Sequence, residues 1–468
     1  MVKLCNGDNR DYIKKINEDY KNVTDLNIKK IKNIYIIYLE SIIDQNKIND
    51  YILKIIPKSH IPRDIKELIP SPNIKDVSDY DTLSLYLESG FTIIINRHQI
   101  IAVETRGNLS RSISTPNTEG TIYGPKESFV ENYQVNLGLI KRRVKSKDLK
   151  NKDVYIGRYT KNMASVLYID SIAEEEIFEN VIKKLENIDR DGVNDITQLK
   201  KYLGDKTTNP FPAFKLTERP DVVASALLEG KIVIILDNSS DALIVPSFLA
   251  DFINPIADHY EKSININFLK ILRFFCFFLA ILTPAIYVAI TTYNQETIPT
   301  TILINFQEQR SKVPFPAVVE CIVTLIICEI LRESDIRFPS NYGSATSILG
   351  ALVLGEAAVS AGIVSPIMII IVAITFISSL IFTDLEIINS IRHWRFFFLF
   401  IAAIYGLFGI GIGIIALFTS LTSYEVFNKP YFYPISPFDF TYIKQTLFKI
   451  KTKKRSKLLS KNRYKEAP

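Results

Sequence analysis

Two carboxylates inside an apolar segment are the first residues whose chemistry needs an explanation. Glu320 and Glu329 lie in residues 314–339, which read PFPAVVECIVTLIICEILRESDIRFP. An ionised side chain at membrane depth is costly and rarely faces lipid. The two glutamates are separated by about two and a half turns of a helix, so they point to opposite sides and each needs its own partner.

Basic residues close in sequence could neutralise these carboxylates. Arg332 lies three residues beyond Glu329 and is within side-chain reach on the same helix face. Glu333 and Arg337 could form a second pair where the chain leaves the apolar stretch. Two interpretations stay open: carboxylates that are satisfied and fix how helices assemble, or an ion path through a membrane.

A third carboxylate, Glu356, lies in residues 344–362, SATSILGALVLGEAAVSAG. One side of this predicted helix carries small residues, which lets a neighbouring helix approach closely. The other side carries Leu349, Val353 and Glu356, and an apolar stripe with one carboxylate is typical of a pore lining with a hydrophobic constriction. The alternative is that this face packs on another helix and Glu356 is paired.

The elements that must position these residues are predicted membrane helices. Residues 272–293, 366–383 and 396–421 approach the 20 or so apolar residues that a spanning helix needs, and residues 317–331 and 344–362 are weaker candidates. Basic residues flank both ends of this half, so the positive-inside rule places both termini in the cytoplasm. That requires an even number of crossings. The five candidate segments make an odd number, so we expect the shortest of them, residues 317–331, to be re-entrant.

The chain before about residue 262 is charged and contains a repeat. IYIIYLESI (residues 34–42) resembles ASVLYIDSI (residues 164–172), and LYLESGFTIIINRHQIIAVE (residues 85–104) resembles ALLEGKIVIILDNSSDALIV (residues 226–245). Each copy predicts a strand, a helix, a variable stretch, a helix that ends at a glycine, and two strands. The glycines at these matched positions are Gly90 and Gly230.

This pattern predicts a fold class of two related α+β or α/β subdomains, followed by an α-helical multi-pass membrane domain. The expected boundaries are residues 1–145 for the first subdomain with its connector, 146–262 for the second, 263–425 for the membrane domain and 426–468 for a basic tail.

The connector between the copies, residues 106–143, is rich in turn formers and charges and leads into a predicted helix from about Glu127. It could be a solvated loop, or an ordered ion-pair strut that joins subdomains or neighbouring subunits. The residues of this connector motif are Arg106, Arg111, Pro116, Glu119, Gly124, Pro125, Lys126 and Glu127.

Composition argues against several classes of function. The four histidines and four cysteines form no cluster with metal-ligand spacing, so we expect no metal site. Neither soluble copy has a phosphate-binding glycine loop or a nucleophile–base pair, so we expect no enzyme and no cofactor. The basic residues 141–145 are not interleaved with aromatic residues, so we expect no nucleic-acid partner.

Several motifs resemble the A subunits of GerA-type spore germinant receptors. RSISTPNTEGTIYGPKESF followed by NLGLIKRR resembles their signature segment, and VPFPAVVE, EILRESDIRFP, GALVLGEAAVSAGIVSP and KPYFYPISPFD also fit, from about residue 38 to residue 437. Two positions depart from the family pattern. His259 stands where a tyrosine-like residue is usual, and Glu356 stands where glutamine is common.

The resemblance implies a multi-pass protein of the spore inner membrane that works in spore germination. It implies a transporter-like B subunit that binds the germinant, a lipoprotein C subunit, and an oligomer of this chain that forms a germinant-gated cation channel in the lipid bilayer. The alternatives are a secondary transporter, which would show related membrane halves, and a structural or signalling subunit that is not a channel.

Overall fold

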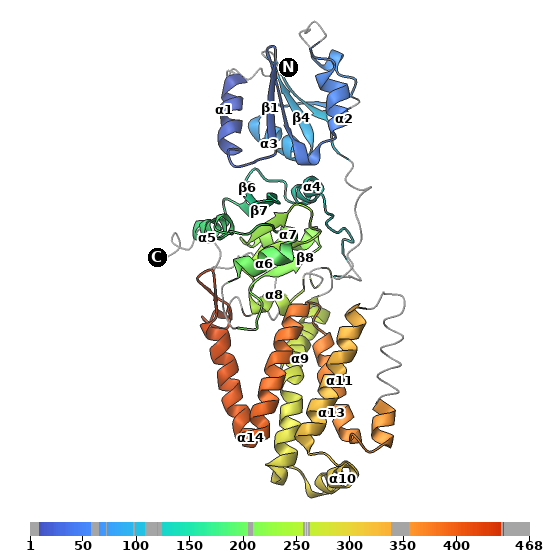
Figure 1. Cartoon of the computed structure of the whole chain (residues 1–468). Coiled ribbons are helices and arrows are strands. Elements are labelled where there is room, and N and C mark those ends of the chain that lie inside the picture. Colours follow the sequence, from blue (N-terminus) through green and yellow to red (C-terminus); the bar gives the residue numbers. More distant parts are fainter. Residues whose placement is uncertain are drawn as a thin grey trace. The chain divides into compact units, whose positions relative to one another are not determined.

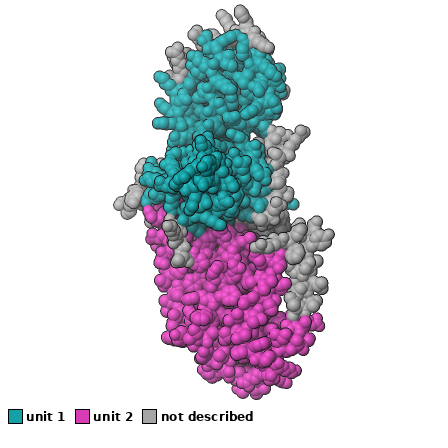
Figure 2. Space-filling view, viewed as in Figure 1, with its two compact units in different colours: residues 1–207, 213–247, 453–468 teal, residues 208–212, 248–452 magenta. Residues whose placement is uncertain are grey.

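The structure, a computed structural model, describes residues 9–57, 65–71, 73–96, 99–107, 119, 124–204, 209–255, 258, 260, 263–337, 355–440 and 443. The chain forms two compact units, coloured separately in Figure 2. The first unit contains the described residues before 205 together with 213–247. The second contains 209–212 and the described residues from Phe248 onward, so it begins ahead of the predicted boundary at residue 263.

The first unit opens with a five-stranded sheet whose strand order is β1-β2-β4-β5-β3 and whose neighbouring strands are all antiparallel. Helices α1 and α3 cover one face and α2 lies on the other (Figure 1). The elements are α1 (Asn9–Asp19), β1 (Leu26–Ile31), β2 (Ile34–Leu39), α2 (Gln45–Ile48), β3 (Ile74–Asp76), α3 (Tyr80–Glu88), β4 (Phe91–Ile95) and β5 (Ile100–Glu104).

The central strands of this sheet are apolar along their whole length because both faces are covered. Ile37 and Ile93 face the cluster that includes Leu83 of α3. Ile36 and Ile94, one residue along, face the opposite cluster. A sheet that buries both faces therefore explains the runs IYIIYL and FTIII, where a sheet with one solvated face would alternate apolar and polar residues.

The second sheet repeats the first, with the order β6-β7-β9-β10-β8 and antiparallel neighbours. Gly90 and Gly230 occupy matching places, between α3 and β4 and between α7 and β9, and both have a positive φ, 85° and 90°. The repeat is of the α+β class. Its elements are β6 (Leu149–Ile156), β7 (Asn162–Ile169), α5 (Glu175–Glu186), α6 (Ile196–Leu203), β8 (Lys215–Thr217), α7 (Pro220–Leu228), β9 (Ile232–Leu236) and β10 (Ala242–Val245).

Helix α4 (Tyr133–Arg143) precedes the second sheet and begins later than the predicted start at Glu127. The reason is the cap: the side chain of Asn132 accepts a hydrogen bond from the backbone N–H of Val135 at 3.2 Å. Residues 125–130 are irregular.

The second unit is mainly helical. Within the described residues, α9 and α14 are long and apolar enough to cross a bilayer, and α13 is a shorter apolar helix. Residues 355–360 are also helical. The elements are α8 (Leu249–Ile253), α9 (Ser263–Thr292), α10 (Thr300–Arg310), α11 (Ala317–Arg337), α13 (Pro366–Leu380), α14 (Leu385–Ser423), β11 (Glu425–Val426) and β12 (Lys429–Pro430).

Helix α11 contains residues 317–331 and extends six residues beyond them, and the re-entrant course expected for this segment stays a prediction. The helix is uninterrupted over 21 residues. Contacts at both of its ends show that α11 and α13 run in the same direction: Glu320 contacts Ser365 near the start of both helices, and Arg332 contacts Ser379 near the end of both. The charged residues near the end of α11 lower the local hydropathy, so the apolar segment ends before the helix does.

Helix α14 corrects the expectation of one straight span over residues 396–421. The backbone of Gly406 has φ 59° and ψ −142°, and the helix reverses there into two arms that lie side by side (Figure 1). The arms pack closely: a Cβ at Gly409 would lie 2.6 Å from the carbonyl oxygen of Ile401, and one at Gly413 would lie 2.6 Å from the ring of Phe398. Glycine suits this reversal because it has no Cβ.

Candidate functional site

Glu329 of α11 is the centre of a partly buried cluster of charges, which we call the Glu329 cluster. Arg332 Nη1 lies 3.3 Å from Glu329 Oε2, and the spacing of one helical turn brings the two together as expected. Arg392 Nη1 and Arg395 Nη1, both from the first arm of α14, lie 3.5 Å and 3.4 Å from the same carboxylate. Three guanidinium groups therefore share one carboxylate.

Arg395 is the most deeply buried member, with 1% of its side chain exposed. Its Nε donates a hydrogen bond to the backbone carbonyl of Ala280 in α9 at 2.7 Å. Pro284 lies four residues further along α9 and has no N–H, so this carbonyl lacks its usual helical donor. The guanidinium therefore satisfies a main-chain acceptor that the proline leaves open.

Arg332 extends the cluster to a fourth helix. Its Nη2 donates to the hydroxyl of Ser379 in α13 at 2.9 Å, and its guanidinium lies 4.6 Å from the centre of the Phe376 ring. The Glu329 cluster thus ties α9, α11, α13 and α14 together. Guanidinium groups stay charged in proteins, so the cluster is suited to holding helices in register and to presenting positive charge.

Glu320 is buried with 1% of the residue exposed, and its partner is not a basic residue. Its Oε1 accepts two hydrogen bonds from Ser365, from the backbone N–H and from the hydroxyl, each at 2.6 Å. Its Oε2 has no hydrogen-bond partner among the described residues. The expected ion pair is therefore replaced by a cap: Ser365 is the N-cap residue of α13, and Glu320 of α11 holds it in place.

The structure describes only some of the other residues predicted for the membrane domain. Leu349 and Val353 lie outside the described residues, so their role in a pore stays a prediction. Glu356 lies in the helical residues 355–360 and its side chain is exposed. The pairing of Glu333 with Arg337 also stays a prediction, because the Arg337 side chain lies outside the described set, although Glu333 does have a partner.

The connector attaches mainly to the second repeat. Glu127 forms ion pairs with Arg142 and with Arg143, the latter at 2.5 Å. Glu119 accepts a hydrogen bond from the hydroxyl of Thr217 at 2.6 Å, and burial raises the pKa of this carboxyl.

Arg106 instead belongs to the first repeat, where its guanidinium lies 5.4 Å from the ring of Phe91 and its Nε lies 3.9 Å from Glu104. Gly124 has a φ of 108°, Pro125 and Lys126 follow it in an irregular stretch, and Arg111 and Pro116 lie outside the described residues. Arg106, Glu119 and Glu127 of the described connector therefore have partners, and Lys126 is exposed.

The junction between the two repeats holds a buried polar cluster that sequence reasoning missed. Burial would raise the pKa of Asp25, but the Lys141 ammonium 2.5 Å away outweighs it and holds that pKa below its ordinary value. Burial raises the pKa of Glu88 to about 7, although a 2.9 Å hydrogen bond from Tyr20 Oη and the ammonium groups of Lys141 and Lys150 favour ionisation. No sequence motif marks these residues, which are far apart in the chain.

Arg392 and Arg395 were also missed, although a signal existed. Arg395 is followed directly by an apolar run. Pro284 lies in another apolar helix and has no N–H, so the backbone carbonyl four residues before it lacks a helical donor. Together these two features indicate that a buried donor is required. Among the described residues there is no group of three or more His, Cys, Asp or Glu side chains that could hold a metal ion.

Comparison with known proteins identifies the family. The model of the Bacillus/Clostridium GerA spore germination protein family matches residues 11–459. Spore germination protein KA of Bacillus subtilis (strain 168) is 36% identical over 443 residues, 91% of this chain and 81% of that protein. The uncharacterized membrane protein YfkQ of the same strain is 36% identical over 413 residues, 86% of this chain and 80% of that protein.

A crystal structure of the N-terminal domain of the A subunit of the Bacillus megaterium spore germinant receptor GerK3 is 27% identical and covers 50% of this chain and 92% of that chain, with a TM-score of 0.37. The family model spans almost the whole chain and the curated relatives match over most of their length. The chain therefore belongs to the GerA family of spore germination proteins.

Proposed function

We propose that this protein acts in spore germination as the A subunit of a germinant receptor in the spore inner membrane. It works with a transporter-like B subunit and a lipoprotein C subunit, and copies of it form a germinant-gated cation channel. The family supports the role in germination. We propose no covalent chemistry for it, since the buried charges of the second unit pair with one another or cap helices.

A membrane topology with an even number of crossings supports this proposal. Helices α11 and α13 run in the same direction, so the end of α11 and the start of α13 lie at opposite ends of the helix pair. The two arms of α14 count as two crossings because of the reversal at Gly406. With α9, α11, α13, both arms of α14 and the predicted span at residues 344–362, the count is six. Both basic ends then lie on the cytoplasmic side without any re-entrant segment.

The observation that carries the channel proposal is the exposed side chain of Glu356. It lies in the helical residues 355–360, next to Ala358, which packs against the apolar cluster around Val288 and Leu325. A carboxylate in such a setting avoids lipid and faces water or another subunit. In a ring of copies, the glutamates would form an acidic ring that favours cations, and Leu349 and Val353 would form the hydrophobic constriction.

Ion selectivity measured in planar bilayers tests this proposal. Purified wild-type protein is expected to give cation-selective currents, and Glu356→Gln is expected to weaken the preference for cations while it keeps the volume of the side chain. Leu349→Ala is expected to widen the constriction and raise the basal current. An unchanged selectivity in Glu356→Gln together with an unchanged basal current in Leu349→Ala would contradict a pore along this face.

A further inference from the structure

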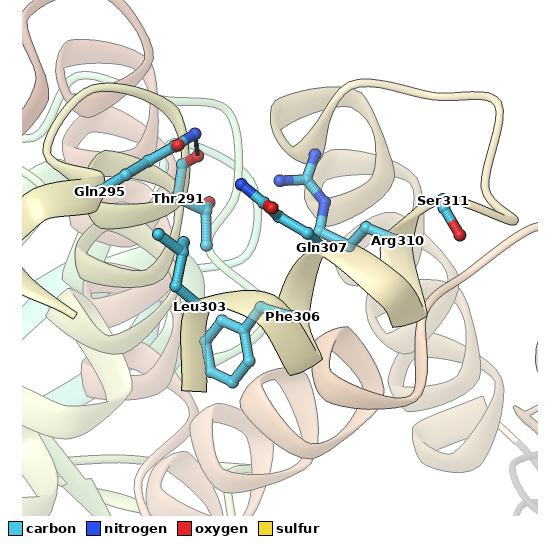
Figure 3. A pocket seen from close by; sticks show the side chains of 7 residues that line it. All are labelled: Thr291, Gln295, Leu303, Phe306, Gln307, Arg310 and Ser311. Atoms are coloured by element: carbon cyan, nitrogen blue, oxygen red, sulfur yellow. Dashed lines mark hydrogen bonds between the residues drawn. The ribbon is translucent and has the colours of Figure 1, made fainter. Parts of the chain in front are cut away.

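A pocket of about 230 Å³ lies between the C-terminal end of α9 and helix α10. Leu303 and Phe306 of α10 supply apolar atoms to its lining, and Figure 3 shows Gln307 and Arg310 of the same helix extending on the side where Thr291 and Gln295 lie. Nothing in the Glu329 cluster or in the predicted pore uses these residues. The pocket is smaller than the 300–1,000 Å³ of typical sites for drug-sized ligands, so its ligand would be small.

Two backbone carbonyls at the end of α9 already accept hydrogen bonds from within the protein. The carbonyl of Ala289 accepts hydrogen bonds from the backbone N–H groups of Tyr293 and Asn294, at 3.0 Å and 3.2 Å. The carbonyl of Thr291 accepts one from the side-chain amide of Gln295 at 2.8 Å, drawn as a dashed line in Figure 3. The partial negative charge at this helix end is therefore partly satisfied within the protein.

The donors on the α10 side remain open. Arg310 is the one formally charged residue in the pocket lining, and it makes no ion pair with any described residue. Its Nε is buried and has no hydrogen-bond acceptor among them. Leaving a buried donor unsatisfied is unfavourable. The side-chain amide of Gln307 extends into the same space and adds donors next to the guanidinium (Figure 3).

We propose that this α9–α10 pocket binds the carboxylate or phosphate group of a small anionic molecule, with Arg310 as its charged partner and Gln307 as a second donor. A planar guanidinium pairs with either group through two parallel hydrogen bonds. Leu303 and Phe306 would contact the apolar part of the ligand. The anionic group could belong to a free molecule or to a lipid headgroup, and the inference stands independently of whether the protein conducts ions.

The test is protection from thermal unfolding of the purified full-length protein by sodium phosphate and by sodium acetate, measured against sodium chloride at equal ionic strength. A ligand that binds only the folded state raises the apparent stability with its concentration. Arg310→Gln is expected to raise the apparent Kd at least about tenfold, the loss expected for a charged hydrogen bond. Lys312→Gln removes the same charge from an exposed position two residues away and is expected to leave the Kd unchanged.

Two further experiments complete the test. Gln307→Ala leaves the charge in place and is expected to weaken binding, which guards against a folding defect in Arg310→Gln. If the ligand is a lipid headgroup, anionic phosphatidylglycerol in nanodiscs is expected to stabilise wild type but not Arg310→Gln, and to compete with phosphate for the pocket. If phosphatidylglycerol does not compete with phosphate, the ligand is a free anion. Absence of saturable, anion-specific protection in detergent and in nanodiscs, or equal losses in Arg310→Gln and Lys312→Gln, would overturn the proposal.

Discussion

Arg395 Nε donates a hydrogen bond to the backbone carbonyl of Ala280 across 2.7 Å, at the level of α9 where Pro284 leaves that carbonyl without a helical donor. The same guanidinium contacts Glu329 of α11. One side chain of α14 therefore closes a gap in the hydrogen bonding of α9 and ties it to the charge cluster of α11. Proline is tolerated in a membrane helix where a neighbouring helix satisfies the freed group.

Replacing Arg395 is expected to cost more stability than replacing Arg392. Both contact Glu329, but only Arg395 satisfies the Ala280 carbonyl. Arg395→Met keeps much of the side-chain volume and leaves this buried acceptor unpaired, which costs about 1–3 kcal/mol. Thermal unfolding of the purified protein in detergent measures the difference, with Arg392→Met as the matched control. Equal losses in the two variants would show that the carbonyl bond contributes nothing.

Glu329→Gln is expected to destabilise the helical unit by about 3–5 kcal/mol, because it removes the one carboxylate that contacts three arginines. Yield of folded protein and unfolding in detergent are the measurements. Glu308→Gln removes an exposed carboxylate of α10 and serves as the control, with an expected change near zero. If Glu329→Gln were as stable as wild type, the three arginines of the Glu329 cluster would not depend on Glu329 for their counter-charge.

Glu88 makes the stability of the first unit depend on pH. Its pKa in the folded protein is about 7, above the ordinary value of 4.5, so the folded state holds a proton that the unfolded state loses. The stability that this proton contributes is present below pH 4.5 and is lost as the pH rises through 7. Relative to Glu88→Gln, wild type is expected to lose about 3 kcal/mol across this window.

Chemical unfolding between pH 4.5 and pH 8 checks the prediction for Glu88. The groups around it are Tyr20, Lys141, Lys150 and Asp148, so the variant has to be compared with wild type at each pH to cancel their own titration. Glu131→Gln, at an exposed position of the same unit, is expected to follow wild type. Parallel pH profiles for wild type and Glu88→Gln would contradict the argument.

The reversal of α14 predicts that Gly406 tolerates no side chain. A Cβ there would lie 2.8 Å from Cβ of Tyr293, and the backbone conformation is one that residues other than glycine rarely adopt. Gly406→Ala is expected to cost about 1–3 kcal/mol or to prevent assembly of the hairpin. Gly411→Ala is the control, because a Cβ at Gly411 has no atom within 4 Å. Expression level and unfolding in detergent separate the two variants, and equal behaviour would argue for a straight helix.

Local patterns in the sequence determined a large part of this architecture. The matched blocks around Gly90 and Gly230 predicted a duplicated unit, and the two sheets have the same strand order. Helical spacing alone predicted that Arg332 lies beside Glu329, and the distance of 3.3 Å agrees with it. Such features are readable because they depend on residues that are close in the chain, where the period of a helix or a strand fixes which side chains meet.

Tertiary structure decided the rest, because the deciding contacts join residues far apart in sequence. Nothing local to Glu320 indicates Ser365, and nothing local to Glu329 indicates Arg395. Average hydropathy could not reveal the reversal at Gly406, since glycine is frequent in membrane helices and only its backbone dihedral angles separate a turn from a span. Buried charges had to find partners wherever packing brought them, and packing is a property of the whole helical unit.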